Sequence, residues 1–191
     1  MKEKKSNLTI WIWNLIVFVS GVILDQWTKV FMTQLLKDKP SIPIIKDILE
    51  LHYLENRGAA FGMLQGKRYY FIIIAVVVFV VIGWIMWKLP REKKFNKLHI
   101  TLSLILAGAI GNSIDRVAKG YVVDFIYFKL IDFPIFNVAD IYITVSTIWL
   151  AIMLLFLYKE EDFDFLNHKK ESPNSESEIS DHNDEKGRKS E

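Results

Sequence analysis

The chain has 191 residues, 51% of them hydrophobic, and its 24 Lys and Arg against 22 Asp and Glu leave a net charge of +2. This length predicts one domain of modest size. There are no cysteines, which excludes disulfide bonds and thiolate chemistry, and the four His residues lack the spacing of metal ligands. We therefore expect neither a metal-dependent nor a cysteine mechanism, and no metal ion. We also expect no cofactor and no nucleic-acid partner.

The hydrophobic residues occur in four blocks, each long enough to cross a bilayer as a helix. The clearest block runs from Tyr69 to Trp87 without a charge, and as a helix it would cover roughly 30 Å of hydrocarbon. Trp and Tyr residues gather at the block ends, as is typical of a membrane interface. The predicted spans are about 8–31, 69–87, 98–114 and 141–158. The sequence thus predicts a mainly α membrane protein with four transmembrane helices.

The first block follows a Lys-rich start and could instead be a signal peptide. Its apolar run is longer than a usual signal core, and no Ala-x-Ala pattern precedes Asp25. We therefore expect this block to be retained as a helix.

The distribution of charge orients the spans. The loop at 88–97 carries five Lys or Arg against one Glu, so the positive-inside rule places it in the cytoplasm. Both termini would then be cytoplasmic, and the segments 32–68 and 116–137 would lie on the outer side.

The first outer segment has the pattern of a short strand. Leu49, Leu51 and Tyr53 alternate with Glu50 and His52, which is a period of two. The glycines that follow, at 58 and 62, indicate a tight turn back toward the membrane. We expect an outer β segment at about 41–66, forming a small extracytoplasmic β-sheet that lies on the bilayer; an irregular loop is the alternative.

The composition changes abruptly near residue 159. From there the chain is rich in Ser, Glu and Asp and cannot bury enough apolar surface to offset the entropy of ordering. We expect a membrane domain at 1–158 and an acidic, disordered cytoplasmic tail at 159–191.

The most informative polar residues lie at the ends of the last two blocks. Asn112, Asp115 and Arg116 close the third block and can share one helical face. Asn137 and Asp140 repeat the three-residue offset where the fourth block begins. Because charge at the edge of a membrane span costs free energy, this cluster indicates a function.

Asp124 lies between these two groups, among apolar neighbours that would raise the pKa of its carboxyl. If Asp124 and Asp140 met at about 4 Å, they would repel by roughly 4 kcal/mol at an effective dielectric near 20, or about three pKa units. One carboxyl would then stay protonated near neutral pH while the other ionised. Such a pair could activate a water and protonate a leaving amine, as in aspartic proteases.

Several of the carboxylates also have a structural interpretation. Asp25 could pair with Lys29 one helical turn away, and Asp115 with Arg116 could anchor the interface or form an ion-pair scaffold. We favour these roles for Asp25 and Asp115. Asp140 could be a helix N-cap, but its polar neighbours favour chemistry.

Two other classes of protein could share these features. A small transporter or channel would also have four spans and intramembrane carboxylates, but the middles of the second and fourth blocks, 72–82 and 144–154, carry no polar group beyond hydroxyls. A non-catalytic assembly factor could use the outer strand as a docking edge, which explains the strand but not the carboxylates. A hydrolase would use the carboxylates for chemistry, and its outer strand could clamp an extended peptide by backbone pairing.

Five short motifs occur in order along the chain. They read DQWTK at 25–29, NRGAAFG at 56–62, GAIGNSIDR at 108–116, VVDF at 122–125 and FNVAD at 136–140. With the four spans, they resemble the signature blocks of the bacterial lipoprotein signal peptidase family, signal peptidase II, over residues 10–158. The segment between positions 124 and 140 is somewhat short for that family.

The resemblance implies a membrane aspartic endopeptidase that removes the signal peptide from prolipoproteins just before a diacylglyceryl-modified cysteine, near the outer face of the bacterial cytoplasmic (inner) membrane. Asp124 and Asp140 correspond to the family's catalytic dyad. Substrate-binding or supporting positions correspond to Asn56, Asn112, Arg116, Asn137, Asp25 and Asp115. The implied partners are the prolipoprotein signal peptide, membrane lipid and globomycin-type inhibitors.

Overall fold

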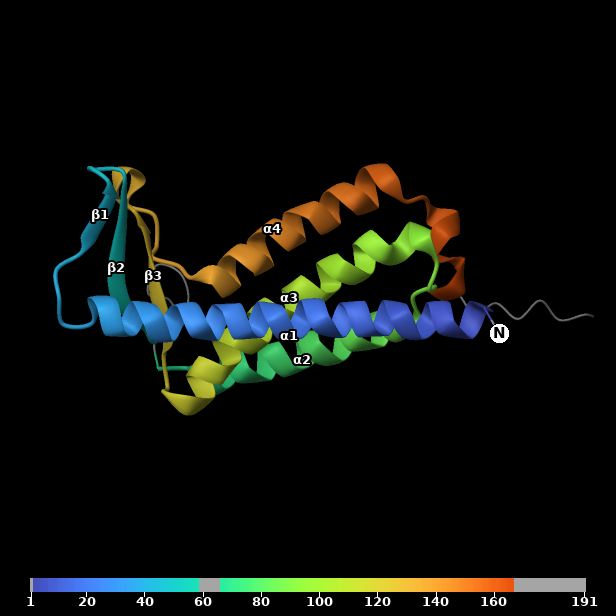
Figure 1. Ribbon diagram of the computed structural model, residues 1–191, viewed down its shortest axis with the longest axis horizontal. Helices are drawn as coiled ribbons and strands as arrows, with labels where there is room; N and C mark the ends of the chain where they lie inside the picture. Colours follow the sequence, from blue (N-terminus) through green and yellow to red (C-terminus); the bar gives the residue numbers. More distant parts are fainter. Residues whose placement is uncertain (1, 59–65, 167–191) are drawn as a thin grey trace, which may run out of the picture. The chain divides into compact units, whose positions relative to one another are not determined.

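The computed structural model describes residues 2–58 and 66–166, and within this part of the chain four helices are long and apolar enough to cross a membrane (Figure 1). They are α1 (Lys2–Leu36), α2 (Arg68–Lys88), α3 (Asn96–Ala118) and α4 (Val138–Ile152), and a π-helical segment, Met153–Leu157, continues α4. The predicted mainly α fold with four such helices is confirmed. α1 and α3 extend about one turn past the predicted spans. In α3 this extension includes Asp115 and Arg116, whose side chains have partners inside the protein.

Helix α3 is the central helix and packs against α1, α2 and α4. Of its membrane-crossing window 67% is buried, against 17% for α1, 6% for α2 and 11% for α4. The three helices around α3 thus expose their apolar side chains, as expected where lipid is the solvent. The buried face of α1 is different, because Asn14, Asp25 and Lys29 lie on it.

A three-stranded antiparallel sheet lies at one end of the helices, with its strands running across the helix ends (Figure 1). Its strands, in spatial order, are β1 (Ile42–Ile45), β2 (Leu49–Asn56) and β3 (Val122–Phe128). The small sheet predicted from the outer segment is confirmed, and β1 and β2 lie within 41–66. β3 was not predicted, although its sequence VVDFIYF is rich in β-branched and aromatic residues.

Strand β3 is held against α1 by an apolar cluster. Val123 and Phe125 pack with Leu36 at the end of α1. Because alternate side chains of a strand point to opposite faces, Asp124 faces away from this cluster. Asp124 pairs with Leu54 in the register of β2 and β3, which brings Asn56 diagonally beside it.

A turn at Gly120 connects the end of α3 to the start of β3. Gly120 has φ +83°, a left-handed conformation that glycine adopts without steric cost. After this turn the backbone nitrogen of Val123 donates to Asp115 Oδ2 at 3.2 Å. The segment that carries Asp124 is thereby tied to α3.

Residues 160–191 form a second unit, of which the structure describes a 3-10 helix, Glu160–Leu166. From residue 167 onward the predicted acidic tail lies outside the described residues. The part of the predicted turn that covers residues 59–62 lies outside them as well.

Candidate active site

Asp124 is buried on β3, with 1% of its surface exposed, and both of its carboxylate oxygens accept a hydrogen bond from an amide. Asn56 Nδ2, on β2, donates to Oδ2 at 2.8 Å. Asn137 Nδ2, at the start of α4, donates to Oδ1 at 2.6 Å. The sheet and the start of α4 thus hold this carboxyl from two sides.

Asp140 lies in the first turn of α4 and is part of its cap. Asn137, and not Asp140, is the N-cap: its Oδ1 accepts from the backbone nitrogen of Asp140 at 3.1 Å. Asp140 Oδ2 in return accepts from the backbone nitrogen of Asn137 at 3.1 Å, which completes a capping box. The interpretation of Asp140 as an N-cap was therefore wrong in position, because the capping box places a carboxylate three residues after the cap.

The second oxygen of Asp140 connects the start of α4 to α3. Asn112 Nδ2 donates to Asp140 Oδ1 at 2.8 Å. Asn112 Oδ1 accepts from Asn137 Nδ2 at 3.1 Å, and that same nitrogen donates to Asp124. Two asparagine amides therefore link the two carboxyls, which the sequence separates by 15 other residues.

The environment of Asp124 favours its protonated form. Burial raises the pKa of the Asp124 carboxyl to about 7, and the nearby charge of Asp140 acts in the same direction. The amides of Asn56 and Asn137 and the charge of Lys29 oppose this shift and keep the pKa from rising further. A carboxyl with this pKa can hold a proton near neutral pH and also release it, as an acid catalyst must.

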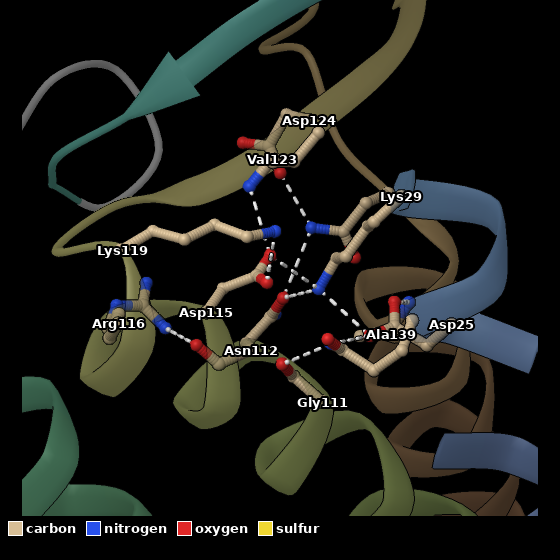
Figure 2. Close-up of polar contacts among 12 residues, drawn as sticks. Asp25, Lys29, Gly111, Asn112, Asp115, Arg116, Lys119, Val123, Asp124 and Ala139 are labelled. Carbon is tan, nitrogen blue, oxygen red and sulfur yellow. Dashed lines mark hydrogen bonds and ion pairs between the residues drawn. The ribbon is translucent and has the colours of Figure 1, made fainter. Parts of the chain in front are cut away.

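Lys29 lies at the centre of a buried charge network next to Asn112, Asp115 and Asp25 (Figure 2). The predicted pair with Asp25 is present, with Nζ and Oδ2 2.9 Å apart. Nζ is also 3.4 Å from Asp115 Oδ2 and donates to Asn112 Oδ1 at 2.8 Å. Asp25 Oδ1 accepts from the backbone nitrogen of Ala139 at 3.0 Å, so the network joins α1, α3 and the start of α4.

Asp115 and Arg116 are adjacent in sequence but face different partners. Asp115 pairs with Lys29 and, at 2.9 Å, with Lys119 Nζ. Arg116 instead reaches Gly58, and its Nη2 donates to the Gly58 carbonyl oxygen at 3.4 Å. The Arg116 guanidinium also lies over the ring of Phe71 on α2, 4.6 Å from its centroid. The expectation that both residues share one face is therefore wrong, because successive residues on a helix point about 100° apart.

A pocket of about 800 Å³ opens beside the two carboxyls between α2, α3 and α4. Asp124, Asp140 and Arg116 line its polar end. Its remainder is mainly apolar, with side chains from all three helices: Phe71, Ile74, Val78, Ile105, Ala109 and Ile143. The site thus joins a charged end to a long apolar wall.

Among residues 2–58 and 66–166, no group of three or more His, Asp or Glu side chains could hold a metal ion. His52 is exposed on β2 against the ring of Tyr127, and His99 is buried in α3. The candidate site therefore consists of carboxyl, amide and guanidinium groups.

Two residues near the site have contacts that were not expected from the sequence. The sequence predicts Lys29 only as a partner of Asp25, yet Lys29 also contacts Asn112 and Asp115. Gly111 lies so close to Asp25 that a Cβ at this position would collide with the carboxylate. A lysine within an apolar block was the available signal for Lys29, since such a residue must find a buried partner.

Comparisons with known proteins cover nearly all of the described chain. The family model described as Signal peptidase (SPase) II matches residues 17–156, a range that contains every candidate site residue named above. A lipoprotein signal peptidase from Caldanaerobacter subterraneus subsp. tengcongensis is 52% identical over 143 residues, which are 74% of this chain and 95% of that protein. One from Halothermothrix orenii is 40% identical over 146 residues, 76% of this chain and 95% of its own.

Two solved structures are similar as well, both described as structures of a bacterial membrane enzyme. One is 34% identical with a TM-score of 0.65, and the match covers 83% of this chain and 93% of the other. The second is 36% identical with a TM-score of 0.64, over 75% of this chain and 92% of the other.

Proposed function

The chain belongs to the signal peptidase II family of membrane peptidases, and on that premise we propose that Asp124 and Asp140 are the catalytic dyad that cleaves the signal peptide from prolipoproteins just before a diacylglyceryl-modified cysteine. Family membership makes the protein a hydrolase, and its four apolar helices make it a multi-pass membrane protein. The dyad, the cleavage point and the orientation in the membrane are the proposal.

One observation carries the assignment of the dyad. Asn137 donates from its side chain to Asp124 and from its backbone to Asp140, so a single residue joins both carboxyls beside the pocket. The two aspartates lie on a strand and a helix that are held together by this contact. Such an arrangement supports two carboxyls acting on one bond.

In the proposed reaction, the ionised carboxylate takes a proton from a water molecule as the water oxygen attacks the scissile carbonyl carbon. The protonated carboxyl gives its proton to the leaving nitrogen as the C–N bond breaks. The dyad starts and ends with one proton, so its charge is restored after each turnover. The raised pKa of Asp124 supports Asp124 as the group that holds the proton, although the pair titrates as a unit.

The pocket suits a lipid-modified substrate. Its apolar wall between α2, α3 and α4 could take the acyl chains of the diacylglyceryl group, which would hold the scissile bond at the charged end. Arg116 lines that end and could donate to carbonyl oxygens of the substrate backbone. We expect globomycin-type inhibitors to occupy the same pocket.

The charge distribution supports an orientation with this end outside the cell. Segment 88–97, which joins α2 to α3 and carries five basic residues, lies at the helix ends opposite the sheet (Figure 1). The loop and both termini would face the cytoplasm, and the dyad would lie near the outer face of the bacterial cytoplasmic membrane. A substrate anchored by its lipid would meet the dyad there without entering the bilayer centre.

The experiment is cleavage of a diacylglyceryl-modified precursor by the purified protein in detergent. Asp124→Asn and Asp140→Asn should each reduce kcat by at least about a hundredfold, the usual contribution of a positioned acid or base. Asp132→Asn is the matched control, since Asp132 is an exposed aspartate that accepts from Tyr127 on the same sheet. Full activity of either dyad variant in folded protein would refute the assignment.

A further inference from the structure

Lys29 has more partners than an ion pair between two helices requires. Its side chain is completely buried, and its Nζ lies within 3.4 Å of Asp25 Oδ2, Asp115 Oδ2 and Asn112 Oδ1. Asp25 and Asp115 would suffice to balance its charge. The hydrogen bond to Asn112, drawn in Figure 2, therefore calls for a separate explanation, because Asn112 in turn donates to Asp140.

That bond determines which way the amide of Asn112 faces. A lysine ammonium can donate hydrogen bonds but cannot accept them, so Asn112 must turn Oδ1 toward Lys29 and Nδ2 away from it. Nδ2 then meets Asp140 Oδ1 at 2.8 Å as a donor. The flipped amide would turn its oxygen toward Asp140 and its nitrogen toward Lys29, which would set two acceptors and two donors against each other.

The same orientation extends to Asp124. Asn112 Oδ1 accepts from Asn137 Nδ2 at 3.1 Å, and this nitrogen donates to Asp124 at 2.6 Å. The oxygen of Asn137 is already engaged as the cap of α4. Lys29 and Asn137 therefore both donate to Asn112 Oδ1, while Asn112 Nδ2 donates to Asp140 and Asn137 Nδ2 donates to Asp124.

The charge of Lys29 also acts on the dyad. Its field lowers the pKa of Asp124, opposing burial and the charge of Asp140. Around the site, Asp25 lies beside Lys29 on α1, Asp115 and Arg116 lie on α3, and on α4 Asp140 and Tyr142 are close enough to interact electrostatically with these groups. Lys119 lies farther out, pairs with Asp115 and is 32% exposed.

We propose that Lys29 is a positioning residue for hydrolysis, which orients the Asn112 and Asn137 amides toward the two carboxyls and contributes the buried positive charge that the dyad requires. The proposal rests on the proposed function, because it assigns to Lys29 a role in the same reaction. It differs from a purely structural role, since an ion pair that only joins α1 to α3 would not change how the carboxyls titrate or turn over.

The first test is Lys29→Met, assayed with the diacylglyceryl-modified precursor across a pH series. We expect kcat to fall by about tenfold or more with KM changed less than about twofold, because the reacting groups lose their alignment while the pocket is intact. We expect the alkaline limb of kcat/KM to move up by about half a unit to one unit, because loss of a nearby cation raises the pKa of a carboxyl.

Lys119→Met is the matched control, because it removes the other cation on Asp115 and touches neither asparagine. It should leave both kcat and the pH profile near wild type. Lys29→Arg keeps the charge and should restore the pH limb more than it restores kcat. The proposal is overturned if Lys29→Met keeps the wild-type kcat and profile, if it changes KM alone, or if Lys119→Met has the same effect.

Lys29→Met could leave Asp25 as an unpaired buried charge and fail to fold. The double variant Asp25→Asn with Lys29→Met avoids this, while Asp115 keeps Lys119 as its partner. Infrared titration of the protonated Asp124 carboxyl, identified by its loss in Asp124→Asn, should show a higher pKa in the folded Lys29 variant without any substrate. An unchanged titration overturns the role of Lys29 even if the precursor is cleaved, whereas active Asp124→Asn or Asp140→Asn protein overturns the dyad itself.

Discussion

Replacing Asn56 with alanine should move the pH dependence of the enzyme upward. Asn56 Nδ2 donates to Asp124 Oδ2 at 2.8 Å and lowers the pKa of that carboxyl. Removing a donor destabilises the ionised form, so the pKa of Asp124 rises. A hydrogen bond to a charged group contributes about 1.5–3 kcal/mol, which corresponds to about one to two pKa units.

The wild-type pKa of Asp124 and the direction of its shift set the expected dependence of activity on pH. The pKa of Asp124 is about 7 in the wild-type protein, and in Asn56→Ala it should become roughly 8 to 9. In the proposed reaction the active dyad holds one proton, and kcat/KM reports the free enzyme, so activity should be lost as pH rises through this pKa. At pH 8.5 the wild type should retain only about 3% of its maximal kcat/KM, and the variant about 25% or more of its own maximum.

The assay is cleavage of the diacylglyceryl-modified precursor from about pH 5 to 10, with each profile scaled to its own maximum. Scaling matters because Asn56 lies in the site and its loss should also lower the maximal rate. Ser41→Ala is the matched control, since it removes a 3.1 Å donor from a different carboxylate of the same sheet, Glu50. An alkaline limb that is unchanged or moves down in Asn56→Ala would show that this hydrogen bond does not control the proton of the dyad.

Two further predictions concern packing and substrate binding. Gly111→Ala should lower the free energy of unfolding by roughly 1–3 kcal/mol, measured by thermal unfolding in detergent, because the added Cβ collides with the Asp25 carboxylate. Gly83→Ala is the control, since a Cβ there meets nothing within 4 Å in the described part of the chain. Equal stability of the two variants would contradict the argument. Arg116→Gln should raise KM by about tenfold with little change in kcat, because it removes the guanidinium that we propose donates to the substrate backbone. A fall in kcat alone would be inconsistent with that role, and the exposed Arg57→Gln, which loses a pair with Glu55, serves as its control.

The helical part of the fold was readily predicted from the sequence. A segment that crosses a bilayer must be apolar and must satisfy its own backbone hydrogen bonds, so each long uninterrupted block implies one helix. The ends were less accurate at α1 and α3, because the apolar blocks stop at about residues 31 and 114 while the helices continue to Leu36 and Ala118. The strand β3 was missed because its pairing with β2 joins segments about 70 residues apart.

For the site, the sequence indicated which residues are candidates, but it did not indicate most of their contact partners. The motifs at 108–116, 122–125 and 136–140 indicated Asp124, Asp140 and the asparagines around them as candidates, because placing acids and amides at the edge of a membrane costs free energy and so indicates a function. The sequence could also predict the pair of Asp25 with Lys29, since one helical turn brings them together.

Contacts between distant segments decided the rest. The packing of α1, α3 and α4 brings Lys29 to Asn112 and gives Asp115 and Arg116 different partners. It also places Asn137 as the cap of α4. The same packing buries Asp124 on a strand held against α1. The sequence determined which groups had to be buried or paired in a membrane, but only the tertiary structure decided which groups meet, because hydrogen bonds and charge pairs act over a few ångströms in space and not along the chain.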